Sequence, residues 1–146
     1  MFALFAFLGA LAALVSVATT RRLARTRPDP GRFERRSWAA YLLVAALIYV
    51  AFAALGGAAG TWLALELGGV ALYGGIALAG ARRSFRLVGL GWLAHALWDL
   101  VLHPAGHPGY VPAWYPPLCL GFDVAAGLWP FVADRPGQPS PLRSVP

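Results

Sequence analysis

The sequence has little charge. Only 12% of its 146 residues are charged, whereas about a quarter of the residues in a typical soluble domain carry a charge. Hydrophobic residues make up 59% of the chain, and they form long uninterrupted runs. This composition excludes a soluble fold and indicates a protein that lies in a lipid bilayer.

Several residues and motifs with a familiar chemistry are missing. Lysine is absent, so all twelve basic residues are arginine, and the only cysteine, Cys119, excludes an intramolecular disulfide. The sequence contains no nucleophile elbow, His-Glu-x-x-His zinc motif, P-loop or dinucleotide fingerprint. The net charge of +6 is spread over connections that flank apolar segments, and we therefore expect no nucleic-acid binding.

Five apolar segments approach the roughly 17–25 residues that a helix needs to cross the hydrocarbon core. They cover residues 2–19, 38–55, 61–80, 85–103 and 117–133. None of them alternates like a strand, which argues against a β-barrel. We predict an all-α polytopic bundle of five spans, forming one domain over residues 1–133. The Pro-rich stretch 134–146 is predicted to be a disordered cytoplasmic tail.

The arginines predict the orientation of the spans. They lie in the first connection, in the third connection and in the tail, while the second and fourth connections have none. By the positive-inside rule, the N-terminus faces outward and the C-terminus inward in the plasma (inner) membrane of the cell. A cleaved signal peptide is the alternative for residues 2–19, because Ser16 and Ala18 suit a cleavage site. Against it, no basic region precedes this segment and seven arginines follow it.

Small residues predict how the helices pack. The third span and its approach contain eight glycines, and small residues let helix backbones come close together in lipid. The glycine pairs that begin at Gly68 and Gly74 are the candidates for close helix contact. We therefore expect the third span to form the centre of the bundle.

Three of the six acidic residues, Glu66, Asp99 and Asp123, fall inside spans. An acid at the middle of a membrane helix costs about 2.5–3.5 kcal/mol on insertion scales, and such residues usually point inward toward a partner. The helical rise places all three at a similar depth in the outer half of the bundle. Because no arginine lies inside a span, the possible partners are protons, metal ions, histidines and hydroxyl groups.

The fourth span carries His95, Asp99 and His103 at intervals of four residues, which places them along one stripe of a helix. His95 and His103 lie too far apart along the helix to bind one ion together. Either His–Asp pair could do so, with Asp123, Glu66 or His107 completing the ligand set, and a two-metal site bridged by Asp99 is also possible.

Imidazole and carboxylate ligands suit zinc, iron or manganese. The predicted metal ligands are therefore His95, Asp99, His103 and Asp123, and Glu66 is the candidate general base. The alternative for each residue is a structural role, such as a buried hydrogen-bonded pair. Cys119 lies one turn from Asp123 and is either a soft metal ligand or, in the simpler interpretation, a small packing residue.

The last third of the chain shows a resemblance to a known family. The residues that carry it are His95-x-x-Trp98-Asp99, His103, and Pro112-x-Trp114-Tyr115-Pro116-x-x-Cys119-x-x-x-Asp123. This pattern resembles the DUF6010-type small bacterial integral membrane proteins of unknown function. The resemblance implies a multi-span membrane fold and brings no established activity, so it assigns no role to any residue.

Three functions are compatible with these observations. The first is a metal-dependent membrane enzyme that acts on a lipid or another apolar substrate. The second is a proton- or cation-coupled carrier, and the third is an accessory subunit whose polar cluster fixes the packing of its helices. The expected partners are the lipid bilayer and, in a homo-oligomer or a larger membrane complex, other protein chains.

Overall fold

The computed structural model describes residues 1–104 and 109–133, and this part of the chain contains five α-helices and no strand. The helices are α1 (Phe2–Ala24), α2 (Pro30–Leu55), α3 (Thr61–Arg83), α4 (Phe85–Leu102) and α5 (Tyr115–Ala133). Each is long and apolar enough to cross a membrane, as the sequence predicts. The predicted tail at 134–146 and His107 lie outside the described residues.

The helices near the arginines are longer than the apolar segments. α1 continues to Ala24 and α2 begins at Pro30, so the first connection is a short turn. Pro30 occupies the first helical turn, and the Asp29 side chain accepts a hydrogen bond from the backbone N–H of Arg32 at 2.8 Å. Arginine favours helix, and therefore the helices extend beyond their apolar runs until a cap and a proline interrupt them.

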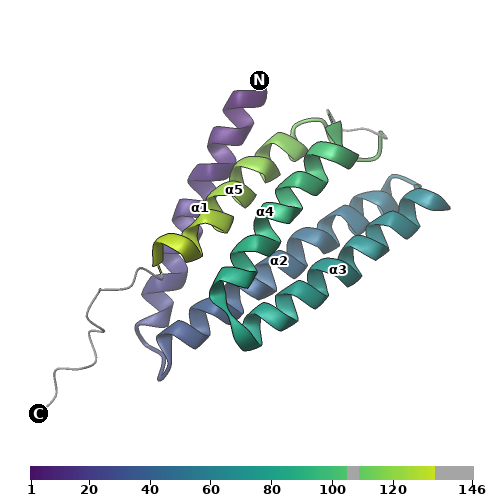
Figure 1. The fold of residues 1–146 in the computed structure, drawn as a ribbon. Helices are drawn as coiled ribbons and strands as arrows, with labels where there is room; N and C mark the ends of the chain where they lie inside the picture. The colour runs from purple at the N-terminus through teal and green to yellow at the C-terminus, as the bar shows by residue number, and fades with distance from the viewer. Residues whose placement is uncertain (105–108, 134–146) are drawn as a thin grey trace, which may run out of the picture.

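The most central helices are α2 and α4. α2 contacts α1, α3 and α4, and α4 contacts α2, α3 and α5, whereas α3 contacts only α2 and α4. α1 packs mainly along α5 and touches α2 over a smaller area (Figure 1). The prediction that the third span forms the centre was wrong, because α3 lies at the edge of the bundle and its Gly68 and Gly75 face no neighbouring helix.

The close helix contacts involve other glycines. A Cβ at Gly121 of α5 would collide with the backbone of Ala6 in α1, and a Cβ at Gly89 of α4 would lie 2.6 Å from the carbonyl oxygen of Gly127 in α5. A Cβ at Gly68 would meet nothing within 4 Å, and one at Gly74 only a Leu43 methyl group at 3.5 Å. Small residues therefore bring α5 close to both α1 and α4.

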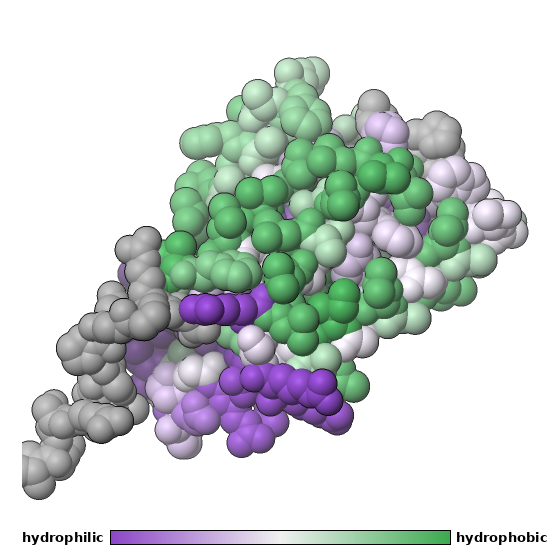
Figure 2. All heavy atoms as spheres, in the orientation of Figure 1, coloured by the Kyte–Doolittle hydropathy of each residue, from purple (hydrophilic) through white to green (hydrophobic). Residues whose placement is uncertain are grey.

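The two ends of the bundle differ in polarity. Figure 2 shows hydrophilic side chains gathered at one end and hydrophobic side chains over the middle of the same face. We call this end, where α1 meets α2 and α3 meets α4, the arginine end, because it carries Arg21, Arg22, Arg25, Arg27, Arg32, Arg35, Arg36, Arg82, Arg83 and Arg86. The buried core next to it is apolar and aromatic, and it is built around Trp38, Leu42, Val88 and Trp92.

Candidate functional site

Four side chains that can ligate a metal meet between α4 and α5. His95 and Asp99 stand one turn apart on α4, and Cys119 and Asp123 stand one turn apart on α5, so each pair shares a face of its helix. One potential ligand atom from each side chain lies within 4.8 Å of the others. We call these four residues the quartet. None of them is more than 5% exposed.

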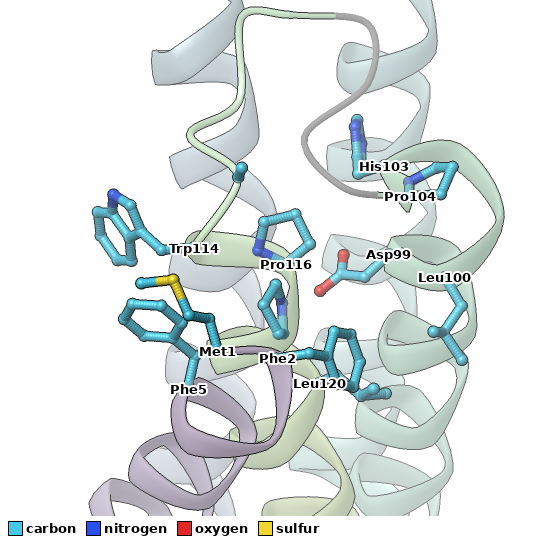
Figure 3. Close-up of a pocket in the computed structure, with 12 residues that line it drawn as sticks. Met1, Phe2, Phe5, Asp99, Leu100, His103, Pro104, Trp114, Pro116 and Leu120 are labelled. Atoms are coloured by element: carbon cyan, nitrogen blue, oxygen red, sulfur yellow. The ribbon is translucent and has the colours of Figure 1, made fainter.

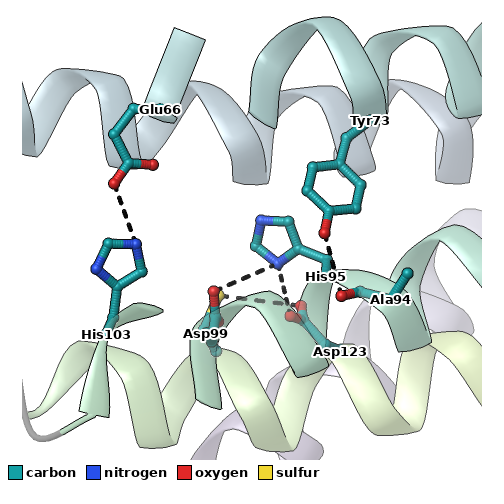
Figure 4. Close-up of polar contacts among 8 residues, drawn as sticks. Glu66, Tyr73, Ala94, His95, Asp99, His103 and Asp123 are labelled. Atoms are coloured by element: carbon teal, nitrogen blue, oxygen red, sulfur yellow. Dashed lines mark hydrogen bonds and ion pairs between the residues drawn. The ribbon is translucent and has the colours of Figure 1, made fainter. Parts of the chain in front are cut away.

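Direct contacts within the quartet centre on Asp123 (Figure 4). Its Oδ2 atom lies 2.7 Å from Nδ1 of His95, and its Oδ1 atom accepts a hydrogen bond from the Cys119 thiol at 3.9 Å. Asp99 Oδ1 lies 3.8 Å from the same His95 nitrogen, beyond hydrogen-bond distance. Asp123 is thus held from two sides, whereas Asp99 is not.

Among the described residues, three buried polar atoms of the quartet have no hydrogen-bond partner of good geometry. They are the two carboxylate oxygens of Asp99 and the Nε2 atom of His95. The Tyr49 hydroxyl and the Cys119 thiol interact with the Asp99 carboxylate, although without strict hydrogen-bond geometry. Buried polar atoms are normally satisfied, and the loosely held Asp99 carboxylate can therefore accept a further cation or proton.

A second polar group lies between α3 and the end of α4. His103 Nε2 is 3.1 Å from Glu66 Oε1, and the Tyr110 hydroxyl donates a short 2.5 Å hydrogen bond to the same oxygen. Partial burial and the Glu66 carboxylate raise the pKa of the Tyr110 hydroxyl. These three residues, which we call the clamp, fasten the connection between α4 and α5 to α3.

The structure thus divides the residues that the sequence grouped together. It brings His95, Asp99 and Asp123 into one site and places Glu66 and His103 in the clamp. His103 leaves the predicted stripe because α4 ends at Leu102 and the backbone of His103 is no longer helical, with φ −120° and ψ 37°. Figure 4 shows the two groups side by side, with the His103 ring directed at Glu66.

Aromatic side chains surround both groups. Tyr49 stacks on His103 with ring centroids 4.4 Å apart, and its ring lies 5.8 Å from that of His95. Tyr73 packs edge-on against His95 at 4.9 Å and donates a hydrogen bond to the Ala94 carbonyl oxygen. Sequence reasoning missed both tyrosines, because an aromatic residue inside an apolar run is equally typical of a side chain that faces lipid.

Cys119 was underestimated for a different reason. The spacing Cys119-x-x-x-Asp123 places the thiol on the same helix face as a predicted ligand, which is a usable signal. A lone cysteine is, however, a common small packing residue. Only the packing of α5 against α4 shows that this thiol lies beside His95 and Asp99.

An apolar cavity of about 660 Å³ leads to Asp99 (Figure 3). It lies between α1, the end of α4 and the start of α5, and its walls include Phe2, Phe5, Leu100 and Pro116. Figure 3 shows the Asp99 carboxylate turned toward this space, which His103 also lines. Asp99 is therefore the quartet residue that a ligand in this cavity would meet.

A second cavity of about 370 Å³ reaches the other side of the quartet. Residues of α1, α2, α4 and α5 line it, among them Tyr41, Ile48, Cys119 and Asp123. Apolar space therefore borders the quartet on two sides.

The donor set of the quartet suits a divalent metal ion. An imidazole, a thiol and two carboxylates are zinc and iron ligands, and the thiol makes manganese a poorer match. A buried carboxylate pair with a single imidazole has an excess of negative charge when ionised, and a low-dielectric interior requires that charge to be neutralised. A divalent cation would neutralise it without a further protein group.

Comparison with known proteins identifies a family. The model of DUF6010, described as a family of unknown function, matches residues 7–136. The match covers most of the chain and therefore extends well beyond the last third, which carries the resemblance in the sequence. No curated protein and no solved structure matches the chain.

Proposed function

Because the chain belongs to the DUF6010 family, whose function is unknown, we propose its function from the site: a metal-dependent membrane enzyme. It would act on a lipid or another apolar substrate. The observation that carries this proposal is the quartet, whose four ligand-type side chains are buried together beside an apolar cavity. Ionisable groups inside a membrane protein are expensive and usually functional.

The contacts favour different roles for the four residues. His95, Cys119 and Asp123 form the connected part of the quartet and would hold the ion, which leaves a position open as in catalytic zinc sites. A bound ion would supply the activation of water for hydrolysis. Asp99 faces the cavity and would hold a proton at its carboxylate and pass it to the leaving group of the substrate.

Glu66 would act at a distance from this chemistry. Its carboxylate is engaged by His103 and Tyr110, so the geometry favours a role for Glu66 in positioning the connection above the cavity. The general base predicted at Glu66 is accordingly proposed at Asp99 instead.

A carrier is the less favoured alternative. Among the described residues, the buried space between the quartet and the arginine end is filled by apolar and aromatic side chains such as Trp38, Leu42, Val88 and Trp92. A transported proton or cation needs polar groups along its path. Among the described residues, the quartet and the clamp lie toward the end opposite the arginines, with no polar side chains of the core connecting them to the arginine end. This arrangement suits a site that is approached from one side.

The test is the metal content of the protein, purified in mild detergent without chelators or a His-tag. We expect about one equivalent of zinc or iron per chain, and its loss in Asp123→Asn and His95→Gln. Glu66→Gln and His103→Gln are matched controls, because they alter buried polar residues of the clamp and should retain the ion. Folding of each variant is checked by its thermal midpoint.

Two results would contradict the proposal. One is a folded protein that takes up no zinc, iron or manganese at any added concentration, which would leave the quartet as a hydrogen-bonded packing element of an accessory subunit. The other is equal retention of the ion in the quartet variants and in the clamp variants. Loss of metal from His103→Gln as well as from the two quartet variants would return the ligand set to the one predicted from the sequence.

A further inference from the structure

A polar groove of about 420 Å³ lies at the arginine end, far along the bundle from the quartet. Three helices contribute an arginine to its lining: Arg21 from α1, Arg35 from α2 and Arg83 from α3. Ser84 and Phe85, at the start of α4, line it as well. Three positive charges are thus brought to one concave site by segments that are distant in the sequence.

Contacts within the protein orient two of these arginines. Arg35 Nε donates a hydrogen bond to the Ala81 carbonyl oxygen at 3.0 Å, which directs the rest of its guanidinium group away from that carbonyl. The Arg21 guanidinium lies over the Trp129 ring, 5.1 Å from its centroid. Such anchoring reduces the side-chain entropy that would be lost when a ligand binds.

The acidic residue of the groove is already engaged. Glu34 Oε1 accepts a hydrogen bond from Trp129 Nε1 at 2.8 Å. Among the described residues, none of the three groove arginines forms an ion pair with a carboxylate. Three arginines against one glutamate give the groove lining a net charge of +2, which is available for an external anion.

The start of α4 adds a second kind of anion-binding group. Ser84 is the N-cap of this helix, and its side chain makes no capping hydrogen bond. The first backbone N–H groups of a helix lack partners within the helix, and the positive end of the helix dipole lies there. Backbone N–H groups, a hydroxyl and guanidinium groups together are the groups that bind phosphate in proteins.

We propose that this groove binds a phosphate group, with the arginines as its charge partners and the start of α4 as its hydrogen-bond donor. A phospholipid headgroup is the expected source, since α1 and α5 present exposed apolar side chains such as Leu14 and Val132 to acyl chains. This site is independent of the metal centre in position and in the residues that form it.

The experiment counts phospholipid molecules that remain bound to the delipidated protein after addition of phosphatidylglycerol, by native mass spectrometry. Thermal stabilisation by inorganic phosphate is measured in parallel, and it tests whether the groove binds a soluble phosphate in place of a lipid headgroup. The variant is Arg21→Gln with Arg83→Gln, and the matched control is Arg22→Gln with Arg25→Gln, which removes two exposed arginines outside the groove. Both variants lower the net charge by the same amount.

We expect one retained phosphatidylglycerol per chain in the wild type and in the control, and a loss of affinity of roughly 10-fold or more in the groove variant, as for removal of two charge-assisted contacts. Stabilisation by inorganic phosphate that disappears in the groove variant, without retained lipid, would keep the phosphate site and assign it a soluble ligand. Equal losses in both variants would overturn the proposal, because binding would then follow overall charge. Absence of both lipid and phosphate binding would overturn it as well.

Discussion

The two aspartates of the quartet have different surroundings although both are buried. Asp123 receives His95 on one oxygen and the Cys119 thiol on the other, so its carboxylate is fixed in place. Asp99 makes looser contacts with Tyr49 and Cys119 and borders the larger cavity. A firmly held carboxylate suits a ligand, and a loosely held one suits proton transfer. This difference assigns Asp99 the chemical role in the proposed enzyme.

Tyr110 carries a prediction about stability and pH. Its hydroxyl donates to the Glu66 carboxylate, and we expect Tyr110→Phe to destabilise the protein by about 1–2 kcal/mol because that hydrogen bond is lost. Burial and Glu66 raise the pKa of the folded-state hydroxyl above its usual value of about 10. The stabilisation is therefore fully present below pH 10 and declines at higher pH, as the unfolded state loses its proton first.

The measurement compares thermal midpoints of wild type and Tyr110→Phe at pH 7 and near pH 11. The difference between the two proteins should be largest at pH 7 and smaller at pH 11. A difference that grows with pH, or no difference at pH 7, would show that the clamp does not hold the connection. His103→Gln should also lower the midpoint at pH 7, because it removes the other partner of Glu66.

At the scale of helices, the pairing of α1 with α5 depends on small residues. Gly121→Ala should destabilise the protein by about 1–3 kcal/mol, because the added methyl group would overlap the Ala6 backbone and force the helices apart. Gly68→Ala is the matched control, since its methyl group meets no neighbour and alanine favours a helix. Thermal unfolding in detergent should therefore separate the two variants, and equal midpoints would contradict this packing.

The positions of the helices were predicted from the sequence better than the pairs in which the helices pack. Long apolar runs define which segments are helical, whatever their partners. The glycines of α3 did not predict which helix packs against it. The sequence gives the number of small residues on a helix but not the direction in which they face. Gly121 and Gly9 looked unremarkable in isolation, yet they lie at the closest helix contact.

The candidate site was predicted in part for the same reason. The interval of four between His95 and Asp99 shows that they share a helix face, and the helical rise brings Asp123 to their depth. His103 satisfied the same interval, but the helix ends at Leu102 and its side chain turns to Glu66. Helix ends and rotations around the helix axis are set by tertiary packing, which a single sequence does not contain.

At the scale of the whole molecule, the arginines lie at one end of the bundle and predict its orientation. We propose that this end faces the cytoplasm, which places the connection between α2 and α3 outside. Thr26→Cys and Ala59→Cys place an exposed thiol at opposite ends, while the native Cys119 is buried and should give no background. In intact cells, a membrane-impermeant maleimide should label Ala59→Cys and should label Thr26→Cys only after permeabilisation. The reverse labelling pattern would show that the arginine end faces outward and would contradict the proposed orientation.

The cavity beside Asp99 has walls of exposed apolar side chains, among them Phe2 and Leu100. We expect an apolar compound that fills it to partition first into the hydrocarbon and to arrive from there. Its occupancy then follows its mole fraction in the membrane, and added lipid or detergent micelles dilute it even when its molar concentration is constant. The affinity of such a compound for this protein is therefore properly expressed as a mole fraction in the membrane and not as a molar concentration in water.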